Sequence, residues 1–185
     1  MLNCGYLFDV SVSALTGWTT TSRQREDGAI DSEQRMPAHG QVVAFSERGA
    51  AELSSVYWRE VERFMHGLVR AQVGPDGQVE LRLRPSGRVL LAFGRRETRT
   101  ANGITRCTHA ITGGLLARRP GGSISFSQET APPALASAIS GFLPRFAAAP
   151  GRPSWTGALY EQLQRRLHLA VSKRYFAALL REKPP

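Results

Sequence analysis

The chain has 185 residues, 42% of them hydrophobic and 21% charged, and carries a formal net charge of +9 at pH 7. A chain of this length can bury about 70% of its unfolded surface in one domain, without a metal or disulfide staple. The composition excludes wholesale disorder, collagen-like repeats and low-complexity sequence. Every basic residue except Lys173 and Lys183 is an arginine, so arginine supplies almost all of the positive charge.

The charge is unevenly distributed along the chain. Residues 1–62 hold five arginines against nine acidic residues, whereas residues 63–185 hold 19 basic residues against six acidic ones. This asymmetry favours an anionic partner, such as nucleic acid, a lipid headgroup or an acidic protein. The alternative is that a GC-rich genome encodes arginine in place of lysine and that these side chains are scattered over solvated faces.

The cysteines and the N-terminus indicate the compartment. With two cysteines, Cys4 and Cys107, the chain has no disulfide framework, and no C-x-x-C pair or H-E-x-x-H motif predicts a metal site. The first residues lack the basic start of a signal peptide, and no run approaches 18 apolar residues. We therefore expect a cytoplasmic protein without a membrane span, cofactor or metal.

Residues 19–40 are polar, mixed in charge and nearly free of large apolar side chains. Such a segment buries too little surface to offset its ordering entropy, which predicts a linker or tail. We expect residues 1–40 to form a flexible N-terminal segment and residues 41–185 to form a single α+β domain. Met36 precedes the first strand-like run, so residues 1–35 are expected to be dispensable or to reflect a misplaced start codon.

A helical stripe of apolar residues runs from Leu53 to Val69, with charged residues on the opposite side. Ser46 or Ser54 can start this helix, and it is expected to end near His66, before Gly67. Residues 68–73 are expected to be extended.

Turn-punctuated strands follow this helix. Pro75-Asp76-Gly77 and Asn102-Gly103 are turn signals, the second typical of a tight hairpin. Apolar and polar residues alternate strictly over 79–84, as in a strand with one buried face. Further strands are expected over 89–93, 104–111 and 123–128.

The last part of the sequence has helical spacing. Leu135, Ile139 and Phe142 predict a helix over about 134–143, and a longer amphipathic helix is expected to begin at Ser154 or Thr156 and to continue to Leu180. The predicted fold class is therefore α+β, with an antiparallel meander of five to six strands packed on a long C-terminal helix.

This order of elements resembles the helix-grip fold of the START/polyketide-cyclase-like (SRPBCC) superfamily. The closest local likeness runs from Gly157-Ala158-Leu159-Tyr160 through Leu167-His168 to Arg174-Tyr175-Phe176, similar to the final helix of some bacterial members, and Gly113 to Arg118 adds to it. The resemblance implies a curved sheet that wraps the last helix and leaves a cavity for an apolar ligand. It carries over no catalytic residue, since the superfamily shares none.

The first functional hypothesis is a non-enzymatic binder of a small apolar or lipid-like ligand between the sheet and the C-terminal helix. The candidate cavity residues are Leu81, Leu83, Leu91, Phe93, Ile124, Phe126, Leu163, Leu167 and Val171. The same residues would also make up a fully packed core, and the sequence leaves both interpretations open.

The second hypothesis is an interaction module that binds an anionic partner through its arginines. The candidate contacts are Arg82, Arg84, Arg95, Arg96, Arg99 and Arg106. Phe93 is the one aromatic residue between 82 and 119, so a base-stacking platform for nucleic acid is poorly supported. The third and weakest hypothesis is an enzyme that uses His109 or His66, with Cys107 two residues from His109 on the same strand face.

Overall fold

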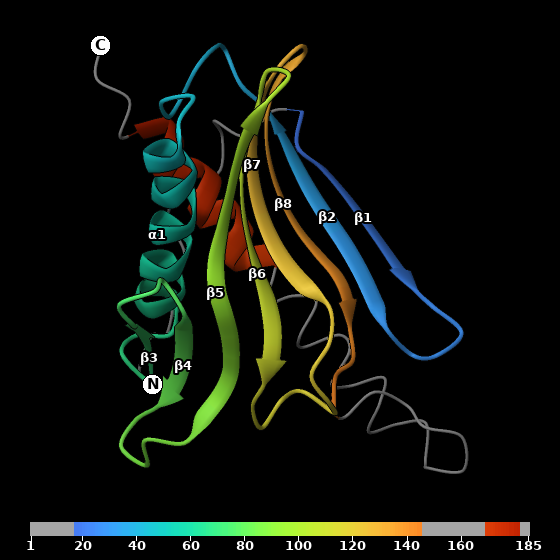
Figure 1. Ribbon diagram of the computed structural model, residues 1–185, viewed down its shortest axis with the longest axis vertical. Helices are drawn as coiled ribbons and strands as arrows, with labels where there is room; N and C mark the ends of the chain where they lie inside the picture. The colour runs from blue at the N-terminus through green and yellow to red at the C-terminus, as the bar shows by residue number, and fades with distance from the viewer. Residues whose placement is uncertain (1–16, 146–168, 182–185) are drawn as a thin grey trace, which may run out of the picture.

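The computed structural model describes residues 17–145 and 169–181 (Figure 1). The elements are β1 (Thr19–Gln24), β2 (Ile30–Pro37), α1 (Glu47–Phe64), β3 (Val69–Val73), β4 (Val79–Leu83), β5 (Val89–Ala101), β6 (Ile104–Gly113), β7 (Ser123–Thr130), β8 (Pro133–Phe142) and a helix over 169–181.

The strands form one antiparallel sheet in the order β1-β2-β8-β7-β6-β5-β4-β3. Figure 1 shows the sheet curving along its length, with α1 and the helix over 169–181 on the same side of it. The molecule therefore has two layers, and its core lies between the sheet and the two helices. This arrangement confirms the predicted α+β class, whereas the strand number of five to six was wrong for the described residues.

The predicted central helix is confirmed as α1. Ser46 is its N-cap, and the hydroxyl oxygen of Ser46 accepts a hydrogen bond from the Gly49 N–H at 3.2 Å. A Cβ at Gly49 would lie 1.9 Å from the Ala44 carbonyl oxygen, so only glycine allows this close approach. The helix ends before His66 and Gly67, which have φ values of 48° and 77°.

The meander also follows the sequence pattern. The strands β3 and β4 and the start of β5 lie where they were expected, and Ala101 pairs with Ile104 across a two-residue turn. Both turn residues, Asn102 and Gly103, have positive φ, as a tight hairpin requires. The strand β5 is longer than expected and contains a bulge between Phe93 and Arg96.

The expectation of a flexible segment over residues 19–40 was wrong, because residues 19–24 and 30–37 form β1 and β2. The strand β2 pairs along β8, which lies 97 to 112 residues further along the chain, from the Pro37↔Ala134 pair to the Ile30↔Phe142 pair. Its buried residue Gln34 accepts hydrogen bonds from Ser137 of β8 and Ser172 of the last helix. Composition alone underestimates this segment because its polar groups find partners in distant parts of the chain.

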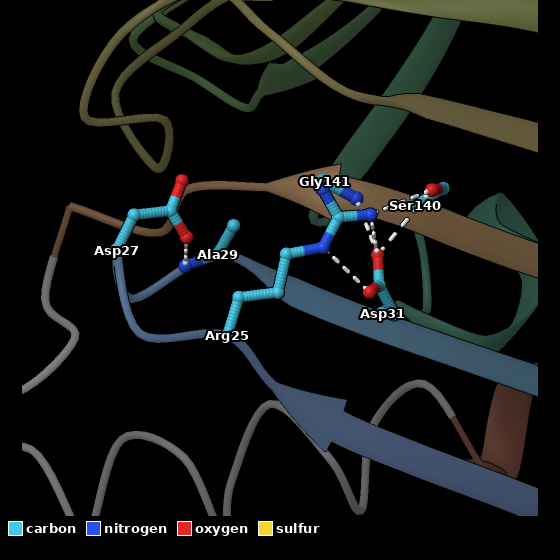
Figure 2. A network of polar contacts seen from close by, with 6 residues as sticks. All are labelled: Arg25, Asp27, Ala29, Asp31, Ser140 and Gly141. Carbon is cyan, nitrogen blue, oxygen red and sulfur yellow. Dashed lines mark hydrogen bonds and ion pairs between the residues drawn. The ribbon is translucent and has the colours of Figure 1, made fainter.

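Figure 2 shows how the turn between β1 and β2 is tied to β8. Arg25 donates two hydrogen bonds of 2.7 Å to the Asp31 carboxylate, and Asp31 accepts a further one of 2.8 Å from the Gly141 N–H. Asp27 accepts a hydrogen bond from the Ala29 N–H within the turn. Met36, expected as a possible start of the chain, is buried in the core.

The helix expected over 134–143 was also wrong, because residues 133–142 form β8. Both neighbouring strands, β2 and β7, pair with this segment, so its backbone groups are satisfied on both sides. Leu135, Ser137 and Ile139 alternate with Ala136 and Ala138, which fits the two-residue repeat of a strand. Leu135 and Ile139 are also spaced as on one face of a helix, so the same residues fit both structures. The described part of the last helix, 169–181, lies within the predicted C-terminal helix, and the rest of that prediction falls outside the described residues.

Candidate functional site

Aromatic rings from both layers fill the middle of the core. Tyr57 of α1 lies 4.5 Å from Phe126 of β7, and Trp58 lies 4.8 Å from Phe93 of β5, measured between ring centroids. Tyr175 of the last helix lies 5.5 Å from Tyr57.

The predicted cavity residues lie in or beside this aromatic cluster. Four of them are buried in the core: Phe93, Ile124, Phe126 and Val171. Leu81 and Leu91 are half-buried against the core, and Leu83 is half-buried on β4. Leu163 and Leu167 lie outside the described residues. The described members are thus core residues, and whether they also line a cavity remains a prediction.

Below the start of α1, a buried polar cluster joins the helix to the sheet. The Trp58 indole N–H donates to the Ser54 hydroxyl at 2.8 Å, and this hydroxyl lies 2.8 Å from His109 Nε2. His109 Nδ1 lies 3.2 Å from the Gly94 carbonyl oxygen, so Nδ1 carries the proton and Nε2 accepts the hydrogen bond from Ser54. The Cys107 thiol lies 3.6 Å from the same Nε2.

Burial keeps the titratable side chains of this cluster uncharged. Desolvation lowers the pKa of His109, with Arg96 as a further lowering influence, so the ring stays neutral. Desolvation also raises the pKa of Cys107 to about 11, which keeps its sulfur protonated and weakly nucleophilic. The His109 side chain is 1% exposed. The Ser54 hydroxyl and His109 thus lie within hydrogen-bond reach of each other, but both are buried inside the core.

The predicted anion-contact arginines do not share one face. Arg99 and Arg106 are directly paired across β5 and β6, whereas Arg96 pairs with the buried His109 and so belongs to the helix-facing side. Arg82 donates to Glu80 and to the Gly87 carbonyl oxygen. Arg84 is exposed at the end of β4. Arg96 and Arg99 are three residues apart in a regular stretch of β5, so their side chains lie on opposite faces of the sheet.

Two of these arginines, Arg95 and Arg96, line a hollow at the side of the molecule. The hollow has a volume of about 550 Å³ and lies between the start of α1, the β3–β4 turn and β5. Its lining residues, hereafter the arginine hollow, are Glu47, Arg48, Ala51, Pro75, Asp76, Arg95, Arg96 and Thr98.

The β3–β4 turn is held tightly against this wall. Gly77 has a φ of 73°, and a Cβ there would lie 2.9 Å from the Cβ of Arg96. Glycine therefore serves both the left-handed backbone and the close approach to β5. The predicted Pro75-Asp76-Gly77 turn is confirmed, and its consequence is that Asp76 lies at the rim of the hollow.

The charges of the hollow are incompletely balanced. Three arginines line it against two carboxylates, and the sole ion pair recorded between lining residues joins Arg95 to Asp76 at 3.8 Å, with both side chains largely exposed. Among the residues that the structure describes, Arg48 and Arg96 have no hydrogen-bonding or ion-pair partner. By contrast, Arg25, Arg35 and Arg63 each pair with a carboxylate.

Sequence reasoning missed two residues of these sites. Arg48 lies in the first part of the chain, whose net charge is negative, so the charge distribution gave no reason to select it. Ser54 was considered only as a helix start. Ser54 lies one helical turn after Ala51, which lines the hollow, and this spacing is the signal that places the two side chains on the same side of α1. His66 lies at the end of α1 with positive φ, and His168 falls outside the described residues.

No family model and no curated protein matches this chain. Among solved structures, the chain is similar to one titled "Crystal structure of Ara h 8.0201", at 12% identity over 87% of this chain and 99% of that one, with a TM-score of 0.31.

In the described part of the chain, no group of three or more histidine, cysteine or acidic side chains is placed to hold a metal ion. No helix among the same residues is long and apolar enough to cross a membrane.

Proposed function

We propose that the protein binds an anionic ligand in the arginine hollow. The observation that carries the proposal is that Arg48 and Arg96, which come from different layers, line one hollow and have no partner among the described residues. Both arginines are exposed, so their guanidinium groups are open to an anion that enters the hollow. The proposal keeps the ligand-binding and anion-binding parts of the sequence hypotheses and moves the site to the edge of the sheet.

The chemistry of the lining favours phosphate or carboxylate groups. A guanidinium group presents a planar fork of N–H donors that matches two oxygens of either anion. Arg48 lies in the first turn of α1, where the helix dipole adds a favourable field for negative charge. The lining contains no aromatic side chain, so stacking of a nucleic acid base has no support there.

The proposal is tested by titrating the protein with inorganic tripolyphosphate in a calorimeter at low and high salt. Wild-type protein is expected to bind, and the Arg48→Ala/Arg96→Ala variant to bind at least roughly tenfold more weakly. The matched control is Arg119→Ala, which removes an exposed arginine outside the hollow. Equal binding by all three proteins, or no binding by the wild type, would contradict the proposal.

A second candidate is the apolar or lipid-like ligand between the sheet and the C-terminal helix. One observation favours it: the Tyr175 hydroxyl is buried in the core and has no hydrogen-bond partner among residues 17–145 and 169–181. A buried unpaired hydroxyl is costly, and a ligand atom beside it would remove that cost. Native mass spectrometry of freshly purified protein tests this candidate, since a co-purifying apolar molecule supports it. A bare protein mass and no uptake of added fatty acid would count against it.

A further inference from the structure

The strand β5 extends well beyond the strand that pairs with it on one side. The partner β4 pairs with residues 89–93 of β5, while β6 pairs with residues 92–101. Beyond β4, the β3–β4 turn lies against Arg96, where a Cβ at Gly77 would be 2.9 Å from the Arg96 Cβ. Among the described residues, no strand pairs with residues 97–101 on the side away from β6. We call this side of residues 97–101 the free edge.

The register with β6 identifies the backbone groups at the free edge. The two-residue hairpin makes Ala101 and Ile104 a hydrogen-bonded pair. Because hydrogen-bonded pairs alternate along an antiparallel ladder, Arg99 and Glu97 also bond to β6. The N–H and C=O groups of the residues between them point away from β6. These residues are Thr98 and Thr100.

The free edge and the arginine hollow coincide. Thr98, which presents its backbone groups to the free edge, also lines the hollow, as does Arg96 at the end of this edge. Arg95 and Arg99 are exposed on the same part of β5, and Glu97 is its one acidic residue. The edge thus offers a row of backbone donors and acceptors beside a concentration of positive charge.

We infer that an acidic peptide in extended conformation binds along the free edge as an added strand. This inference rests on the proposed function, for which it names the class of partner. Main-chain hydrogen bonds to Thr98 and Thr100 would supply the pairing, as in other cases of strand addition. In a strand, every second side chain lies on the same face, so alternate acidic residues of the peptide would reach Arg96 and Arg48 on the side of α1.

Charge at a sheet edge has another known role, which is to prevent pairing between copies of a protein. The two roles differ in what they predict. A protective edge binds no strand, whereas a receptive edge binds one of complementary charge with its backbone. The test must therefore separate backbone pairing from charge attraction.

The probe is a fluorescent peptide of about ten residues that alternates glutamate and valine, followed by anisotropy. Three controls accompany it: a lysine–valine peptide, the acidic peptide N-methylated at alternate residues in either register, and inorganic tripolyphosphate. We expect the acidic peptide to bind at least about tenfold more tightly than the lysine peptide and than one of the two methylated peptides. Bound peptide should slow hydrogen exchange at Thr98 and Thr100, while Glu97 and Arg99, bonded to β6, change little.

A variant pair extends the test to the protein. Thr100→Pro removes an N–H at the free edge without removing a hydrogen bond to β6, and Thr100 lies outside the hollow. We expect it to lose about tenfold in peptide affinity and to keep tripolyphosphate binding, whereas Thr100→Ala keeps both. If Thr100→Pro does not fold, the methylated peptides and the exchange measurement on wild-type protein still decide the question.

The outcomes separate this inference from the proposed function. Tripolyphosphate binding with equal affinity for the acidic peptide and both methylated forms would retain the anion site and overturn strand addition. Tripolyphosphate binding without any peptide binding would also overturn strand addition and leave the arginines as protection of the edge. Absence of both kinds of binding would overturn both. Peptide binding with exchange protection at Thr98 and Thr100 would support the inference.

Discussion

Two polar clusters, one on each half of the sheet, have similar hydrogen-bond lengths and very different surroundings. The buried cluster comprises Ser54, Trp58, Cys107 and His109, between α1 and β6. The hairpin cluster comprises Arg25, Asp31, Ser140 and Gly141, at the turn between β1 and β2 (Figure 2). The His109 side chain is 1% exposed, whereas that of Arg25 is 46% exposed.

This contrast shows that burial, rather than bond length, determines what a hydrogen bond contributes. A group that loses its partner in the core also loses water, so the full desolvation cost appears. A group that loses its partner at the surface is rehydrated. Both clusters depress a pKa, by different causes: burial acts on His109, and the hydrogen bond from Arg25 acts first on Asp31.

The largest expected effect comes from removing the hairpin cluster with its strands. A chain starting at Met36 loses β1, most of β2 and the buried Gln34, and it exposes the edge of β8. We expect no cooperatively folded product by circular dichroism and NMR dispersion. A chain starting at Gly17 keeps both strands and is the matched control. A well-folded product from Met36 would restore the expectation that residues 1–35 are dispensable.

The next effect comes from the buried cluster. His109→Ala leaves the Ser54 hydroxyl and the Gly94 carbonyl without their partner and opens a cavity, so we expect a loss of about 2–4 kcal/mol in the free energy of unfolding. Urea denaturation measures it. Thr108→Ala, on the opposite face of β6, should cost much less. Similar losses for the two variants would show that burial of the cluster is not the deciding factor.

The two clusters are expected to lose their contributions to stability in different pH ranges. The folded-state pKa of His109 is lowered from an ordinary value of 6.5, so the unfolded chain binds the proton first. The stability contributed by neutral His109 is present above 6.5 and is lost as the pH falls from there toward the folded pKa. The melting temperature of wild-type protein should fall over this pH range, and that of His109→Gln should change less with pH. Parallel pH profiles would reject this assignment.

The smallest effect is expected at the exposed cluster. The pKa of Asp31 is lowered from 3.8, so its contribution is present above that value and is lost as the pH falls through the lower folded pKa. Asp31→Asn should reduce the melting temperature by a small fraction of the His109→Ala effect, and high salt should reduce the difference further. A loss comparable to that of His109→Ala would reverse the ranking of the clusters.

The sequence was sufficient for elements determined by nearby residues. The helix α1 has its cap, stripe and terminating glycine within one segment, and β4 has strict alternation bounded by turns. It was insufficient for β2 and β8, because each is stabilised by the other, which lies far away in the sequence. The polar composition of β2 and the dual periodicity of β8 gave no local sign of that pairing.

The candidate site was predictable in composition but not in geometry. The density of arginines pointed to Arg95 and Arg96. Simple alternation from Phe93 would place Arg99 on the helix-facing side and Arg96 on the opposite one, and the bulge in β5 reverses this assignment. Arg48 reaches the hollow from a different layer, so only the packing of α1 on the sheet brings it there.

The pairing of β2 with β8 also determines an order of events during synthesis. The segment that completes β2 is translated before α1, yet its partner emerges from the ribosome only after the whole meander has been made. Until then, Met36 and Gln34 cannot be buried, and the edges of β2 and β7 that pair with β8 stay unpaired. A contact of such high sequence separation delays final assembly to the last stage of chain elongation. The nascent chain therefore carries unpaired strand edges until residues 133–142 appear.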